Sequence, residues 1–135
     1  MTPAIEIQRP ATGRRCARVL INGKPVQVEW SRAAERALAR RSRPLVVELE
    51  LYFSCLVKKF VHFHDERPGL KTVPVDDRLR LGFRAVTSSA CSLEEARQRG
   101  RQPEIEIQTE QARRFAPKSV RIDFTGGRWR GSYRL

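Results

Sequence analysis

The stretch RIDFTGGRWRGSYRL, residues 121–135, alternates apolar and polar side chains on both sides of Gly126-Gly127. A two-residue turn at these glycines makes a hairpin whose pairing follows by counting outward from the turn, so that Phe124 faces Trp129. In this register every large apolar group of the stretch lies on one face, and the arginines lie mostly on the other. The stretch therefore predicts an ordered hairpin with a basic outer face, rather than a disordered basic tail.

A second hairpin is predicted by RRCARVLINGKPVQVEW, residues 14–30, because Asn22-Gly23 favours a type I′ turn in which both residues have positive φ. This turn places Val19 opposite Val26. Apolar residues again fall on one face and mostly polar residues on the other, which supports the register.

Two further segments alternate with a period of two, which is typical of strands. Residues 44–63 read PLVVELELYFSCLVKKFVHF, and 78–86 read RLRLGFRAV. The first is too long for one regular strand, so a bulge or sharp bend is expected near residues 56–59. The outward arginines of the second segment are expected opposite Glu48 and Glu50 on an exposed face.

Three segments predict short helices. Ser31 is a good N-cap for a helix over residues 31–43, a capping box starts a helix over 92–100, and 110–115 reads EQARRF. Together with the hairpins they predict an α+β fold. It comprises a twisted, mostly antiparallel sheet with two or three short helices on one side, in a single domain over residues 1–135.

The chain is strongly basic, with 27 Lys and Arg against 15 Asp and Glu, a net charge of +12 and a pI near 10.9. Residues 44–75 are neutral, so the excess lies toward both ends of the sequence. Such a charge attracts polyanions, including nucleic acid and acidic protein surfaces. A genome rich in G and C also raises the arginine content, and the sequence leaves both explanations open.

The cysteines and the apolar segments indicate a cytoplasmic protein. Cys16, Cys55 and Cys91 are odd in number and far apart, which is atypical of a disulfide framework. The first ten residues contain no apolar signal region, and the longest apolar run, residues 51–57, is too short to span a membrane. We therefore expect no signal peptide and no membrane insertion.

Arginines provide the leading candidate binding site, since guanidinium groups on rigid elements contact phosphates well. One group follows the predicted helix at near-helical spacing, with two more arginines just before the first hairpin. The terminal hairpin contributes a second basic face. Solvated surface is the plain alternative for both. The candidate nucleic-acid-binding residues are Arg14, Arg15, Arg32, Arg36, Arg40, Arg43, Arg128 and Arg130.

His62 and His64 form the one group with metal-ligand chemistry, because residues two apart on a strand share a face. Nothing in the spacing determines a third ligand. No motif for a catalytic nucleophile, a phosphate-binding loop or a dinucleotide is present, so no catalytic residue and no cofactor are assigned. Carboxylates near the pair that offer a ligand or acid–base chemistry are Asp65, Glu66, Asp76 and Asp77.

The function predicted from these observations is a small, non-enzymatic cytoplasmic module that binds polyanions. Nucleic acid is the expected ligand, RNA before DNA, through contacts to the phosphate backbone. The first alternative is a protein-interaction or homodimerisation module that uses the outward face of the central strand, where Tyr52, Leu56 and Phe60 lie. The second is a metal-dependent enzyme that uses His62 and His64.

Overall fold

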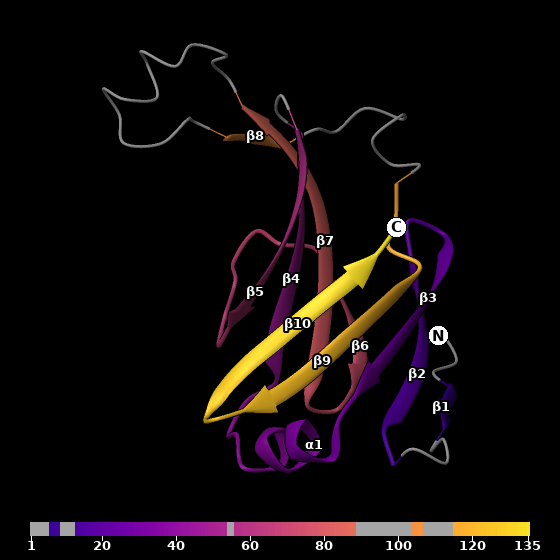
Figure 1. Cartoon of the computed structure of the whole chain (residues 1–135), viewed down its shortest axis with the longest axis vertical. Coiled ribbons are helices and arrows are strands. Elements are labelled where there is room, and N and C mark those ends of the chain that lie inside the picture. Colours follow the sequence, from indigo (N-terminus) through magenta and orange to yellow (C-terminus); the bar gives the residue numbers. More distant parts are fainter. Residues whose placement is uncertain (1–5, 9–12, 54–55, 89–103, 107–114) are drawn as a thin grey trace.

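The computed structural model of the chain consists mainly of β-strands (Figure 1). It describes residues 6–8, 13–53, 56–88, 104–106 and 115–135, and these contain one helix. The elements are β1 (Glu6–Gln8), β2 (Arg15–Ile21), β3 (Lys24–Trp30), α1 (Arg32–Ala39), β4 (Leu45–Phe53), β5 (Val57–His64), β6 (Thr72–Asp76), β7 (Leu79–Ser88), β8 (Glu104–Glu106), β9 (Ser119–Thr125) and β10 (Arg128–Arg134).

The strands form two sheets, each of which contains two hairpins and one short additional strand, β1 or β8. The first sheet has the order β1-β2-β3-β9-β10, and the second has the order β5-β4-β7-β6, with β8 also paired to β7. Within each sheet the two hairpins meet at a parallel pair, β3 with β9 and β4 with β7. All other pairs in the described residues are antiparallel, so the prediction of a mostly antiparallel arrangement is confirmed.

Both predicted turns have the backbone that their residues favour. The φ angles are 52° at Asn22, 75° at Gly23, 61° at Gly126 and 75° at Gly127, all in the left-handed region. Type I′ turns need this region at both central positions, and glycine and asparagine adopt it at the least cost. The predicted registers are confirmed along the whole of the β2–β3 and β9–β10 hairpins.

The two sheets pack face to face, and β9 and β10 run diagonally across β4 and β7 (Figure 1). One cluster of buried residues takes side chains from both inner faces, as the period-two alternation requires. The hydroxyl of Tyr133 on β10 donates a hydrogen bond of 2.5 Å to the backbone oxygen of Glu50 on β4, which links the sheets directly. Among the largest fully buried residues are Trp30, Leu45, Leu49, Leu79, Leu81 and Ile122.

Helix α1 covers one end of the sandwich (Figure 1). It begins as predicted, with the hydroxyl oxygen of Ser31 accepting a hydrogen bond of 3.1 Å from the backbone nitrogen of Ala34. It ends at Ala39 and not at residue 43, because the backbone nitrogen of Arg41 bonds to the carbonyl of Leu38 and tightens the last turn. Its buried side includes Ala34 and Leu38, which belong to the core.

The predicted α+β class is wrong. The described residues are mostly strand with one short helix, instead of one sheet with two or three helices on one side. The predicted helix over 92–100 lies outside these residues, as does 110–114, and Phe115 is not helical. The period-two segments were correctly read as strands, but alternation alone could not show that they divide into two sheets that cover each other.

The expectation of one long bent strand over residues 44–63 is also wrong. The chain reverses after Phe53, and β5 returns antiparallel to β4 with Val57 opposite Phe53. Because the chain reverses, β5 forms backbone hydrogen bonds along the edge of β4 that does not face β7. In a single overlong strand, this segment would continue past β4 and could not pair with it. Glu48 and Glu50 on β4 are only 2% and 5% exposed, although their face was expected to be open.

Candidate functional site

The arginines at the start of β2 hold the structure together. Nη1 of Arg14 donates a hydrogen bond of 2.9 Å to Asp123 on β9, and Nη1 of Arg15 donates one of 2.8 Å to Glu35 on α1. Arg14 also lies 3.8 Å from Glu29 on β3. Both side chains are largely buried and paired with carboxylates, so their charges are compensated within the fold.

The arginines of α1, unlike Arg14 and Arg15, are exposed and have no carboxylate partner in the described part of the chain. Arg32, Arg36 and Arg40 are exposed, and their side chains form no hydrogen bond or ion pair with any residue that the structure describes. They follow one another at a spacing of four, which places them along one side of the helix. Arg43, in the segment after α1, lies 3.7 Å from Glu66, and both side chains are mostly exposed.

The terminal hairpin brings two more arginines to this end of the molecule. β3 ends at Trp30, opposite Ile122, so the last part of β9 and the turn extend beyond β3 and lie beside α1 (Figure 1). Arg128 and Arg130 are exposed on β10, just after this turn. Neither makes an ion pair within the described residues. We call Arg32, Arg36, Arg40, Arg128 and Arg130 the arginine surface.

A pocket of about 510 Å³ adjoins this surface at the end of α1. Arg40, Arg41, Ser42, Arg43 and Asp65 line it. Arg41 forms an ion pair with Asp65, and this hydrogen bond and the charge of Arg41 hold the pKa of the Asp65 carboxyl below its ordinary value. One of the three arginines is thereby partly compensated, and the pocket remains positively charged.

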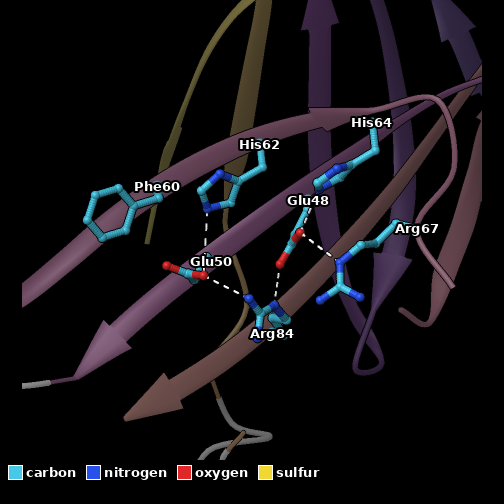
Figure 2. Close-up of a pocket in the computed structure, with 7 residues that line it drawn as sticks. All are labelled: Glu48, Glu50, Phe60, His62, His64, Arg67 and Arg84. Carbon is cyan, nitrogen blue, oxygen red and sulfur yellow. Dashed lines mark hydrogen bonds and ion pairs between the residues drawn. The ribbon is translucent and has the colours of Figure 1, made fainter. Parts of the chain in front are cut away.

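A second pocket, of about 370 Å³, lies on the outer face of the second sheet (Figure 2). Its floor is formed by β4 and β7, and the neighbouring strand β5 provides one side (Figure 2). The residues that line it are charged or aromatic, and they come from separate parts of the sequence. They are Glu48, Glu50, Phe60, His62, His64, Arg67 and Arg84.

Glu48 is the most heavily bonded residue of this pocket. Its Oε1 lies 2.7 Å from Nε2 of His64 and accepts a hydrogen bond of 3.2 Å from Nε of Arg67, and its Oε2 accepts one from Nε of Arg84. Burial alone would raise its pKa, but these hydrogen bonds and the charge of Arg84 lower the pKa to about 2. Glu48 is therefore a charged, fully engaged carboxylate at neutral pH.

Glu50 occupies the other half of the pocket. Its Oε1 accepts a hydrogen bond of 2.8 Å from Nη2 of Arg84 and lies 3.6 Å from Nε2 of His62. The ring of His62 lies next to that of Phe60, with centroids 6.1 Å apart and planes inclined by 20°. Arg84 thus bridges the two carboxylates, while the two rings form a flat surface beside Glu50 (Figure 2).

A strap over the sheet closes one side of this pocket. Residues 65–71 connect β5 at one edge of the second sheet with β6 at the other, so the segment crosses the outer face. It passes over Gly82 on β7, where an added Cβ would lie 2.8 Å from the side chain of Leu70. Arg67 reaches Glu48 from the same segment. Because Gly82 has no side chain, Leu70 of the strap can pack directly against β7 at this position.

The two histidines are paired with the carboxylates of β4 and not with those expected from the loops. Asp65 bonds to Arg41, and Asp76 accepts a hydrogen bond of 2.7 Å from the backbone nitrogen of Arg78. Among the described residues, no three His, Cys, Asp or Glu side chains lie close enough together to hold a metal ion. His62 and His64 therefore belong to a network of hydrogen bonds and ion pairs on the outer face.

Tyr52 and Phe60 lie on the same face of the β4–β5 pair, but on two strands and not on the one central strand that was expected. Tyr52 on β4 is half-buried, Phe60 is exposed on β5, and Leu56 is exposed just before β5 begins. Cys16 is half-buried and carries a free thiol. The positions of Cys55 and Cys91 lie outside the described residues.

The sequence indicated that arginines of residues 78–86 lie near Glu48 and Glu50, but it did not indicate that these carboxylates are buried. The outward arginines of residues 78–86 were expected across from Glu48 and Glu50 in a neighbouring strand, and of these Arg84 lies opposite Glu50. The carboxylates were expected on an exposed face, however, and the strap was read only as a turn. Two glutamates within the otherwise apolar strand LVVELELYF could have indicated buried carboxylates, because buried charges need partners.

No protein-family model, no curated protein and no solved structure matches the chain. The function is therefore inferred from the structure alone. In the described segments, no helix has the length and apolar character needed to cross a bilayer. What these segments define is a β-sandwich with an exposed arginine surface at one end and a buried network of charged residues on one outer face.

Proposed function

We propose that the protein binds polyanions, specifically the phosphate backbone of nucleic acid, through the arginine surface. The observation that carries this proposal is that five arginines from α1 and β10 lie at one end of the sandwich, exposed and without ion pairs in the described residues. Arg14 and Arg15, by contrast, are compensated by carboxylates. Unpaired guanidinium groups on rigid elements gain phosphate contacts at a small ordering cost.

The surrounding charge supports the same proposal. Arg18 and Arg134 are exposed on the outer face of the first sheet, which is continuous with the hairpin of Arg128 and Arg130. Arg121 is exposed on the same face but lies 3.7 Å from both Glu29 and Asp123, which compensate its charge in part. The net charge of +12 adds a long-range attraction that speeds the encounter with a polyanion.

We expect RNA to be a better ligand than DNA because of the geometry of helix α1. Reading of the DNA major groove generally uses a helix that projects from the protein. Helix α1 has eight residues, and its inner side, with Ala34 and Leu38, is buried in the sandwich. Contacts to phosphates and to nucleic-acid shape suit such a surface better, and the expected binding is weakly dependent on base sequence.

The test is a salt titration of RNA binding with two charge-matched variants. One replaces Arg32, Arg36 and Arg40 by Gln, and the control replaces the exposed residues Lys58, Lys71 and Lys118 by Gln. Removing three phosphate contacts should reduce the slope of log affinity against log salt by about 2. The control has the same net charge, and its slope should stay close to that of the original protein.

Two results would contradict the assignment. Equal losses in both triple variants would show that net charge alone drives binding, so that the arginine surface is not the site. RNA affinity that does not change between low and moderate salt would exclude phosphate contacts as the main interaction.

A further inference from the structure

The pocket on the outer face of the second sheet contains a carboxylate oxygen that has no donor in the described part of the chain. Oε1 of Glu50 faces Arg84 and His62, whereas Oε2 makes no hydrogen bond or ion pair there. Figure 2 shows this second oxygen directed to the side of the pocket where Phe60 lies. The Glu50 residue is only 5% exposed, but this oxygen is not among the fully buried unpaired atoms, so it opens to the pocket and can accept a hydrogen bond from a ligand in place of water.

Arg84 also holds this carboxylate in place. Its Nη2 bonds to Oε1 of Glu50 at 2.8 Å, and its Nε bonds to Glu48. A carboxylate with one oxygen held by a fixed guanidinium has little freedom to rotate. Oε2 is therefore preorganised toward the open part of the pocket, which lowers the ordering cost of binding a donor.

Two aromatic rings provide a surface for stacking beside Oε2. Phe60 is 41% exposed, and the neighbouring ring of His62 is inclined to it by only 20°. Rings of this kind bind planar groups by stacking, and phenylalanine and histidine both do so with nucleobases. The pocket thus combines a stacking surface with a hydrogen-bond acceptor.

The charges of the pocket favour a neutral ligand. Arg67 and Arg84 balance Glu48 and Glu50, so these four charged residues of the lining have no net charge. A cation would give up its hydration without a compensating net charge, and it would approach a protein with a net charge of +12. The ligand that fits is planar, uncharged in its ring, and a donor of N–H hydrogen bonds.

We propose that this pocket binds a guanine base, with Oε2 of Glu50 accepting from its Watson–Crick edge and with Phe60 and His62 stacking on its ring. Guanine presents two adjacent donors on that edge, the ring N–H and the amino group. Adenine and cytosine present an amino group next to a ring acceptor, and uracil presents one N–H between two carbonyl acceptors. A carboxylate repels these acceptors, so guanine is preferred. The proposal does not depend on the arginine surface, which is a separate site.

The test measures the affinity of the full chain for GMP, AMP, CMP and UMP by NMR titration at concentrations up to millimolar. GMP should bind most tightly, and Glu50→Gln should weaken it by about 5- to 150-fold. Phe60→Ala should weaken GMP by a similar factor through lost stacking, and Phe60 is exposed, so this variant tests the site without disturbing the core. The matched control, Lys118→Gln, changes an exposed residue outside both proposed sites and should leave GMP affinity unchanged.

Equal affinities for the four nucleotides, no detectable binding of GMP, or GMP binding that survives Phe60→Ala would each overturn the proposal. The source of the base is resolved by comparing GMP with the oligonucleotides AAAGAA and AAAAAA at high salt. Tighter binding of AAAGAA than of GMP identifies RNA, and tighter binding of GMP identifies a free nucleotide. Equal binding of the two oligonucleotides overturns guanine recognition in RNA. Loss of RNA affinity in the arginine variants, with GMP affinity intact, separates this site from the proposed polyanion site.

Discussion

Replacing Glu48 by Gln removes a buried negative charge with almost no change in side-chain volume. The pKa of this carboxyl is about 2 in the folded protein against an ordinary value of 4.5. Burial acts to raise this pKa, but the hydrogen bonds from Arg84, His64 and Arg67 outweigh it. A shift of this size corresponds to about 3 kcal/mol of stabilisation of the folded state at neutral pH.

The sign of the pH dependence follows from the direction of the shift. Because the folded pKa of Glu48 is depressed, its stabilisation is present above the unfolded pKa of 4.5 and is lost as the pH falls toward 2. For this one group, the loss between pH 7 and pH 3 is about 2 kcal/mol. The Gln variant cannot titrate at this position, so its free energy of unfolding should depend less on pH by the same amount.

The assay is urea unfolding of the original protein and the Glu48→Gln variant at pH 7 and pH 3. The destabilisation caused by the substitution should be smaller at pH 3 by about 2 kcal/mol. Glu66→Gln is the matched control, since Glu66 is mostly exposed and its pair with Arg43 is long, and it should cost less than about 1 kcal/mol at either pH. An equal effect of Glu48→Gln at both pH values would refute the reasoning that its charge stabilises the fold.

Substitutions at three further positions test the packing and the turns. Gly82→Ala should destabilise the protein by about 1–3 kcal/mol in urea unfolding, because the added Cβ meets Leu70 at 2.8 Å, and an unchanged midpoint would show that the strap does not pack on the sheet. Tyr133→Phe should cost about 1–2 kcal/mol by removing the hydrogen bond to the Glu50 carbonyl, and a neutral result would mean that the two sheets are not joined there. Gly127→Ala should lower the melting temperature through about 1 kcal/mol of strain at a φ of 75°, and Gly127→Asn should lower it less; the reverse order would contradict a left-handed turn.

The hairpins could be predicted from the sequence because their information is local. Asn22-Gly23 and Gly126-Gly127 select a turn of defined geometry, and the turn then determines every pair of the adjoining strands. The start of α1 was predictable for the same reason, since Ser31 caps a donor three residues away.

The pairing between hairpins could not be predicted in the same way. The alternation of β3 shows which face is buried but not that β9 lies beside it, and the same applies to β4 and β7. Burial of Glu48 depends on this pairing, because Arg84 must lie on the adjacent strand and the strap must cross the same face. The arginines were identifiable by type, but only the folded chain separates the compensated Arg14 from the exposed Arg36.

The parallel pair of β3 with β9 has a consequence for the order in which the chain assembles. Gln27 pairs with Ser119, so the first sheet joins segments that leave the ribosome far apart in time. The β4–β7 pair joins segments that are much closer in the sequence. The second sheet can therefore form during synthesis, before β9 is available to pair with β3. Until the final hairpin is released, the edge of β3 that pairs with β9 and the part of the second sheet that β10 covers remain open, and exposed strand edges and apolar surface of this kind favour aggregation.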